Sequence, residues 1–138
     1  MLSYFSSNTV HYNRYKLRHT EEERKNDVKV IMQEATIPNS KCYGRLPLII
    51  EPSIKILSRL SDNKIKSQYL IKKDCDIVKL KKIIHSIYNV DSSETIILTV
   101  GDNCRIPNNN DTIEYLYNNY KDSDGYLYIT YSIEDFFG

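Results

Sequence analysis

The sequence predicts one α+β domain in which a helix lies across a four-stranded mixed sheet, with a helical extension in front. Three observations predict this class: four short β-branched or aromatic segments, helical repeats of apolar residues, and the order strand, strand, helix, strand, short helix, strand. A length of 138 residues suits a single domain with its own core.

The chain before the first strand divides into two parts. Residues 1–19 are polar and tyrosine-rich, and we expect a flexible N-terminal arm there. Thr20 and Glu23 form a capping box, and apolar residues follow at helical spacing from Val28 to Ala35. Residues 20–44 are therefore an N-terminal helical extension with a loop, and residues 45–138 form the main domain with its C-terminal tail.

The first two strands come next and are expected to be antiparallel. The first covers residues 45–51, with Pro47 near its start and Pro52 after its end. The second covers residues 66–72 around Tyr69, Leu70 and Ile71. Residues 53–65 between them fit a loop with a turn of helix.

The middle of the chain predicts a helix, a strand and a short helix. Asp76 is a good N-cap, and apolar residues recur on one side of a helix as far as Tyr88. The strand over residues 94–101 is nearly all apolar, so we expect it to be central. Residues 105–107 fit a brief edge strand, and a capping box of Asp111 and Glu114 opens a helix over residues 111–120.

The last strand begins at Gly125, where β-branched and aromatic residues alternate as far as Tyr131. This order of elements is the β-grasp plan of ubiquitin-like proteins, in which the first and last strands lie parallel and central. The tail that follows has no apolar periodicity and ends at Gly138. Such a glycine fits either a frayed terminus or a carboxylate that is activated and joined to an amine, because glycine is unhindered at its acyl carbon.

Composition argues against several classes of function. Nineteen basic residues nearly balance eighteen acidic ones, which gives no global charge for nucleic acid. No long apolar run or signal sequence is present, so we expect a soluble, cytosolic chain.

Cys42, Cys75 and Cys104 form no CxxC pair and fit small hydrophobic residues better than metal ligands, disulfides or nucleophiles. No nucleotide-binding or catalytic motif occurs, and no cofactor or metal is expected.

Several segments resemble the autophagy-related ubiquitin-like modifiers of the GABARAP and microtubule-associated-protein light-chain type. These are the first strand over residues 45–51, the segment 69–71, and the C-terminal segments 121–128, 131–132 and 137–138. The C-terminal match is the most specific. Gln68 and Lys72 stand where that family usually has lysine and proline, so the identity of the partners stays open.

The resemblance implies a modifier and not an enzyme. Gly138 would be joined to phosphatidylethanolamine by activating and conjugating enzymes and released by a delipidating cysteine protease. One acyl chain anchors a protein marginally and two anchor it stably, so a diacyl lipid would move the domain from the cytoplasm to the autophagosomal membrane.

The resemblance also implies a site for autophagy receptors and scaffolds that carry an aromatic-X-X-aliphatic motif, bound by strand addition at the second strand. The aromatic pocket would contain Asp27, Ile31, Pro47, Ile49, Leu70 and Tyr126. The aliphatic pocket would contain Tyr69, Ile71, Leu80, Ile83 and Ile84. Taken singly, Ile49, Leu80 and Ile84 fit a core position better than a ligand pocket.

Two alternative functions remain open from the sequence. One is the sister autophagy modifier, whose terminal glycine is joined to a protein lysine. The other is a β-grasp adaptor that binds peptides and is never conjugated.

Overall fold

The computed structural model describes residues 14–57, 66–88, 90–91 and 93–134. Its sheet has the strand order β2-β1-β4-β3, with β1 at Arg45–Pro52, β2 at Gln68–Lys72, β3 at Ile96–Val100 and β4 at Leu127–Ile133. Strands β1 and β4 are parallel and central, and β1 and β2 are antiparallel, which confirms both predictions. Strand β3 pairs with β4 in the antiparallel sense.

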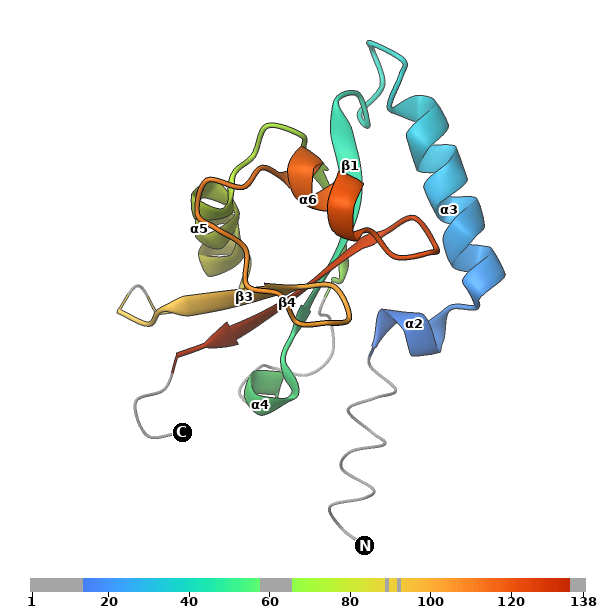
Figure 1. Cartoon of the computed structure of the whole chain (residues 1–138). Helices are drawn as coiled ribbons and strands as arrows, with labels where there is room; N and C mark the ends of the chain where they lie inside the picture. Colours follow the sequence, from blue (N-terminus) through green and yellow to red (C-terminus); the bar gives the residue numbers. More distant parts are fainter. Residues whose placement is uncertain (1–13, 58–65, 89, 92, 135–138) are drawn as a thin grey trace, which may run out of the picture.

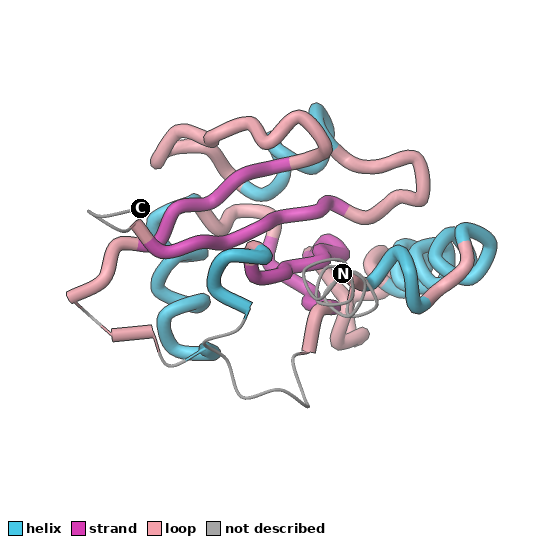
Figure 2. The backbone as a smooth tube through the Cα atoms, turned by 90° about the horizontal axis from the view of Figure 1, so that it is seen from below, coloured by secondary structure: helices cyan, strands magenta, loops and turns pink. Residues whose placement is uncertain are grey.

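Helices cover both faces of this sheet, as Figure 1 shows with α3 and α5 on opposite sides of β1. The described helices are α2 (Tyr15–Arg18), α3 (Glu21–Glu34), α4 (Ile54–Leu57), α5 (Ile77–Tyr88) and α6 (Ile113–Tyr120). Seen from below, α2 and α3 lie together at one side of the strands, away from α5 (Figure 2). A helix across a four-stranded mixed sheet confirms the predicted β-grasp class.

The third strand is at an edge of the sheet, and the prediction that it is central was wrong. Its side chains alternate between buried and half-buried, from Ile96 to Val100. Apolar composition reports how well each face is covered and does not report which strands are neighbours. The brief strand expected at residues 105–107 is reduced to one isolated bridge between Val100 and Arg105.

The last part of the predicted N-terminal arm is structured, because residues 15–18 form α2 and Tyr15 packs on the domain. The side chain of Tyr15 is 5% exposed and lies with Val28, Ile49 and Tyr126 in a second, smaller core. An aromatic ring can bury a large apolar area, so Tyr15 helps to fix this polar segment on the domain. Residues 1–13 lie outside the described residues.

The helix starts follow the predicted chemistry at two of three places. Thr20 and Glu23 form the predicted capping box of α3. The carboxylate of Asp76 accepts a hydrogen bond from the Lys79 N–H at 2.8 Å at the start of α5. Helix α6 is capped by Thr112 and not by Asp111, whose carboxylate instead accepts a hydrogen bond from the Asn108 N–H at 2.9 Å.

The main core lies on the sheet face covered by α5 and α6, and includes Leu48, Leu80 and Leu127. Among the described helices, none has both the length and the hydrophobicity that a membrane span requires. Cys42 and Cys75 are buried as predicted, whereas Cys104 is exposed.

Gly125 joins the closing turn to β4 at a point where α3 leaves no space. Its φ is +97°, and a methyl group there would lie 2.6 Å from Cγ1 of Val28. We expect Gly125→Ala to lower the free energy of unfolding by about 2–4 kcal/mol, from overpacking and backbone strain together. Urea unfolding followed by circular dichroism measures the change.

Gly44 is the matched control for this substitution. Its φ is +70°, and an added methyl group would meet no atom within 4 Å. Gly44→Ala should therefore cost only about 1–2 kcal/mol of backbone strain. Equal losses for the two variants would contradict the contact with Val28, and Val28→Ala should restore part of the stability lost in Gly125→Ala.

Candidate peptide-binding site

The outer edge of β2 presents backbone groups that no strand in the described part of the chain pairs with. Hydrogen bonds from the Ile50 N–H to the Ser67 carbonyl and from the Lys73 N–H to the Gly44 carbonyl set the pairing of β1 with β2. In an antiparallel pair the hydrogen-bonded residues alternate, so the N–H and C=O groups of the residues between point the other way. The outward groups belong to Gln68, Leu70 and Lys72.

Pro47 fits this pattern. It lies opposite Leu70, at a position where β1 makes no hydrogen bond to β2. A missing N–H at this position therefore costs the β1–β2 pairing nothing.

The first pocket, with a volume of about 440 Å³, lies between the start of β2 and α3. Ile31 and Leu70 supply apolar surface, and Tyr69 and Gln68 also line it. Three cationic side chains complete the lining: Lys41, Arg45 and Lys66.

The second pocket, of about 350 Å³, lies between the end of β2 and α5. Ile71, Cys75 and Ile83 provide its apolar part. Its charged residues are Arg45, Lys72, Lys79 and Asp74. Because Leu70 and Ile71 point to opposite faces of the strand, the two pockets lie on opposite sides of the same edge.

The structure brings together some of the residues predicted for the aromatic pocket. Ile31 and Leu70 line the first pocket, while Asp27 is exposed on α3 and is absent from its lining. Pro47 is buried, and Ile49 and Tyr126 are each 0% exposed beneath the pocket's walls. Ile49 and Tyr126 therefore do not line this pocket.

The residues predicted for the aliphatic pocket divide in the same way. Ile71 and Ile83 line the second pocket, and Tyr69 lines the first one. Leu80 and Ile84 are 0% exposed in the main core, and Ile49 is buried in the second, smaller core. All three occupy core positions, as the sequence favoured when each was taken singly. Gly138 lies outside the described residues.

The sequence interpretation missed the basic residues that frame the pockets. Arg45 lines both pockets, and Lys41 and Lys66 line the first. Alternation along the first strand could have found Arg45, because it shares a face with Pro47. Lys41 comes from the loop between α3 and β1, and no local pattern predicts where that loop lies.

The geometry agrees with a comparison with known protein families. Residues 23–138 match the family model described as "Autophagy protein Atg8 ubiquitin like". The chain belongs to the Atg8 family. It is 32% identical to autophagy-related protein 8 of Dictyostelium discoideum over 130 residues, which cover 94% of this chain and 97% of that protein. It is also 32% identical to autophagy-related protein 8e of Arabidopsis thaliana, over 82% of this chain and 88% of the relative.

A solved structure supports the fold of this Atg8-family chain. The crystal structure of Trypanosoma brucei ATG8 superposes with a TM-score of 0.71 and 24% sequence identity. The match covers 91% of this chain and 98% of the other. The family and the fold together identify the chain as a ubiquitin-like autophagy protein of the Atg8 family.

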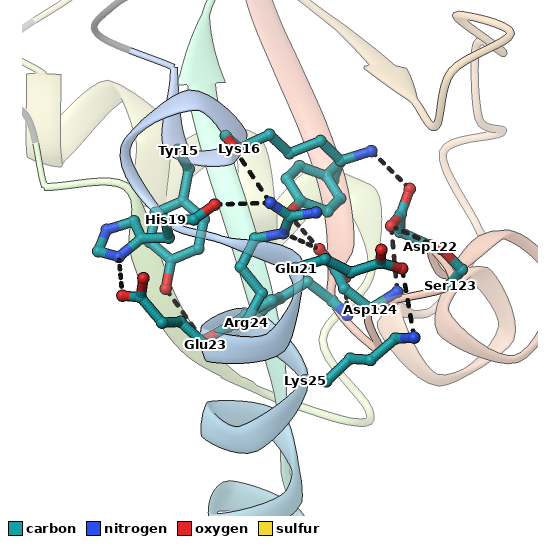
Figure 3. A network of polar contacts seen from close by, with 12 residues as sticks. Tyr15, Lys16, His19, Glu21, Glu23, Arg24, Lys25, Asp122, Ser123 and Asp124 are labelled. Carbon is teal, nitrogen blue, oxygen red and sulfur yellow. Dashed lines mark hydrogen bonds and ion pairs between the residues drawn. The ribbon is translucent and has the colours of Figure 1, made fainter.

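In this Atg8-family chain, a polar network fixes α2 and α3 against the start of β4 (Figure 3). The Arg24 side chain donates from Nε to Asp124 Oδ2 at 2.9 Å and from Nη1 to the carbonyl oxygens of Lys16 and His19. Asp124 also accepts hydrogen bonds from the Tyr126 N–H and the Tyr128 hydroxyl. Since Ile31 on α3 forms a wall of the first pocket, this network helps to position that wall.

Burial controls the ionisation of the groups in this region. It raises the pKa of Tyr126 and Tyr128, and the neighbouring Asp124 raises that of Tyr128 further. Burial also raises the pKa of Asp122, but hydrogen bonds from the Lys16 ammonium and the Asp124 N–H outweigh it and bring that pKa below its usual value. Asp122 therefore stays ionised and holds Lys16 at 2.7 Å.

Proposed function

We propose that this chain is a modifier that is joined through Gly138 to phosphatidylethanolamine on autophagosomal membranes and recruits partners with an aromatic-X-X-aliphatic motif. The free edge of β2 with a pocket on each side carries the proposal. The family assignment supports an autophagy pathway and does not support the sister modifier that is joined to a protein lysine.

The motif spacing matches the geometry of this edge. Side chains three residues apart on a strand point to opposite faces of a sheet. An extended peptide paired with Gln68, Leu70 and Lys72 would therefore place its aromatic side chain in the first pocket, beside α3 (the α3 pocket). Its aliphatic side chain would enter the second pocket, beside α5 (the α5 pocket). Main-chain hydrogen bonds supply affinity in this mode, and the pockets supply specificity.

Conjugation explains how such a domain would act without catalysing a reaction. The activating enzyme would use ATP to convert the Gly138 carboxylate to an acyl adenylate, and an enzyme thiol would displace AMP to form a thioester. The lipid amine would then displace the thiol to form an amide, which a cysteine protease would later hydrolyse. Two acyl chains anchor the product stably, whereas one chain binds only marginally. The protein then serves as a scaffold that moves from the cytoplasm to the autophagosomal surface and brings its peptide partners with it.

Reconstitution with activating and conjugating enzymes and liposomes that contain phosphatidylethanolamine tests both parts. We expect a gel-mobility shift of the wild-type chain and recruitment of a labelled aromatic-X-X-aliphatic peptide to the liposomes. Gly138→Ala should abolish the shift and the recruitment together, because alanine crowds the acyl carbon and the narrow channel of the enzymes.

Leu70→Arg separates the two activities. Leu70 lines the α3 pocket, so the variant should still be conjugated but should lose recruitment by tenfold or more, in line with loss of about 1.4 kcal/mol of contact. Val30→Arg, at an exposed position of α3, is the control and should retain both activities. A wild-type chain that recruits the peptide but is never conjugated would support the adaptor alternative.

A further inference from the structure

The α5 pocket is larger than an aliphatic side chain needs. Its volume is about 350 Å³, compared with about 440 Å³ for the α3 pocket, in which an aromatic residue is proposed to bind. In a protein core, a cavity of about 150 Å³ is enough to bind benzene. A leucine side chain would therefore leave part of the α5 pocket empty, and the walls beside that space would lose van der Waals contacts.

A small residue at the bottom of the α5 pocket makes this space. Ile71 and Cys75 are the innermost residues of its lining, at 7% and 6% exposed, and Ile83 forms a further apolar wall. Burial raises the pKa of the Cys75 thiol, which therefore stays neutral at neutral pH. A neutral cysteine behaves as a small apolar residue, so the bottom of the pocket is apolar and has room that a longer side chain would fill.

Cations surround the mouth of the α5 pocket. Lys72 and Lys79 line it and are exposed. Arg45 also lines it, and a hydrogen bond of 3.1 Å from its Nη1 to the Leu70 carbonyl oxygen holds the guanidinium in place. The face of an aromatic ring carries partial negative charge and attracts ammonium and guanidinium groups, whereas an aliphatic side chain has no such attraction. A ring is therefore favoured in this pocket by charge as well as by volume.

We propose that the α5 pocket selects an aromatic side chain at the fourth position of the partner peptide, because Cys75 leaves room for a ring and three cations line the pocket. The inference rests on the proposed peptide-binding function and extends its motif. Among peptides that pair with β2, those with phenylalanine or tyrosine at position four bind most tightly, and those with leucine bind more weakly.

Titration calorimetry with three synthetic peptides tests the volume and the charge of the pocket separately. The peptides share a tryptophan at position one and carry leucine, phenylalanine or pentafluorophenylalanine at position four. The full chain should bind the phenylalanine peptide about fivefold more tightly than the leucine peptide, because the ring buries more apolar surface and attracts the cations. It should bind the pentafluorophenylalanine peptide about threefold less tightly than the phenylalanine peptide, because fluorination reverses the charge on the ring face.

Cys75→Leu tests the volume, because the longer side chain fills the bottom of the pocket. This variant should bind the leucine peptide at least as tightly as the phenylalanine peptide, since a ring would now be overpacked. Cys75→Ala is the matched control, because it removes the thiol and keeps the space, and it should keep the fivefold ratio. Circular dichroism shows whether both variants are folded before peptide is added.

Lys79→Gln tests the charge at an exposed position and does not depend on repacking the core. The ratio between the phenylalanine and pentafluorophenylalanine peptides should fall from about threefold to below about twofold, because one of the three cations is lost. Lys82→Gln is the matched control. Lys82 is an exposed residue of the same helix outside both pocket linings, so its replacement should keep the threefold ratio.

The same titrations separate this inference from the function on which it rests. If the leucine peptide binds the wild-type chain as tightly as the phenylalanine peptide, the inference is wrong and the peptide site stands. A folded Cys75→Leu variant that keeps the fivefold ratio would contradict the role of Cys75, and a pentafluorophenylalanine peptide that binds as tightly as the phenylalanine peptide would contradict the role of the cations. If none of the three peptides binds, both the peptide site and this inference are overturned.

Discussion

Replacing Asp124 by alanine is expected to lower the free energy of unfolding by about 3–5 kcal/mol, the range for removing one partner of a buried ion pair. The residue is 2% exposed, and its carboxylate accepts hydrogen bonds from Arg24 Nε, the Tyr126 N–H and the Tyr128 hydroxyl. The substitution leaves the Arg24 guanidinium, whose side chain is 11% exposed, without its counter-charge. It also removes a link between α3 and the turn before β4. Because Ile31 of α3 lines the α3 pocket, the affinity of a peptide for this pocket should fall as well.

Urea unfolding followed by circular dichroism measures this loss. Asp102→Ala is the matched control, because the Asp102 side chain is 85% exposed and lies 3.9 Å from the Lys16 ammonium. An exposed pair of this kind contributes up to about 1 kcal/mol. A loss below about 1 kcal/mol for Asp124→Ala would be comparable with an exposed pair and would contradict a buried network that fixes α3.

The chain is also expected to unfold cooperatively above about pH 10, where tyrosine ionises in an unfolded chain. Burial raises the pKa of Tyr88, Tyr126, Tyr128 and Tyr131 above that value in the folded state. Between the two pKa values the unfolded chain has lost protons that the folded chain keeps, so stability is full below about pH 10 and falls as pH rises. Each such tyrosine lowers the free energy of unfolding by about 1.4 kcal/mol per pH unit, so the four together lower it by about 5.5 kcal/mol per pH unit.

Tyrosinate absorbance and circular dichroism, recorded in one alkaline titration, should change together at the unfolding midpoint. Tyr131 offers a clean variant, because its buried hydroxyl has no hydrogen-bond partner among the described residues. Tyr131→Phe should leave stability at neutral pH unchanged or slightly higher and should move the alkaline midpoint upward. Tyr43→Phe, at an exposed position, should not move it. Tyrosinate absorbance that rises well before the helical signal falls would contradict the linkage.

Local chemistry along the chain was enough to predict most elements. The capping box at Thr20, the N-cap at Asp76 and the turn before Gly125 depend on neighbouring residues, and the structure has helices α3 and α5 and strand β4 next to them. The order of strands and helices then predicted the β-grasp class and the parallel pairing of β1 with β4.

Apart from the N-cap of α6, the errors concern contacts between segments far apart in the sequence. Strand β3 is apolar and still lies at an edge of the sheet. Its position depends on how all four strands pair and not on its own composition. Tyr15 belongs to a polar segment and is buried because Ile49 in β1 and Tyr126, just before β4, offer it an apolar surface. Local patterns alone did not predict the candidate site either. Its lining residues Ile31, Leu70, Ile71 and Ile83 were assigned to pockets by the family resemblance, and the structure places them there.

By itself, the sequence determined the class of fold, the family and the strand at which a partner is expected to pair, because alternation, caps and turns are set within a few residues of each other. Only the tertiary structure decided that Ile49, Leu80, Ile84 and Tyr126 are covered and that Arg45 lies across the edge between two pockets. Burial depends on which distant segments share a surface, and the apolar pattern of one segment does not contain that information.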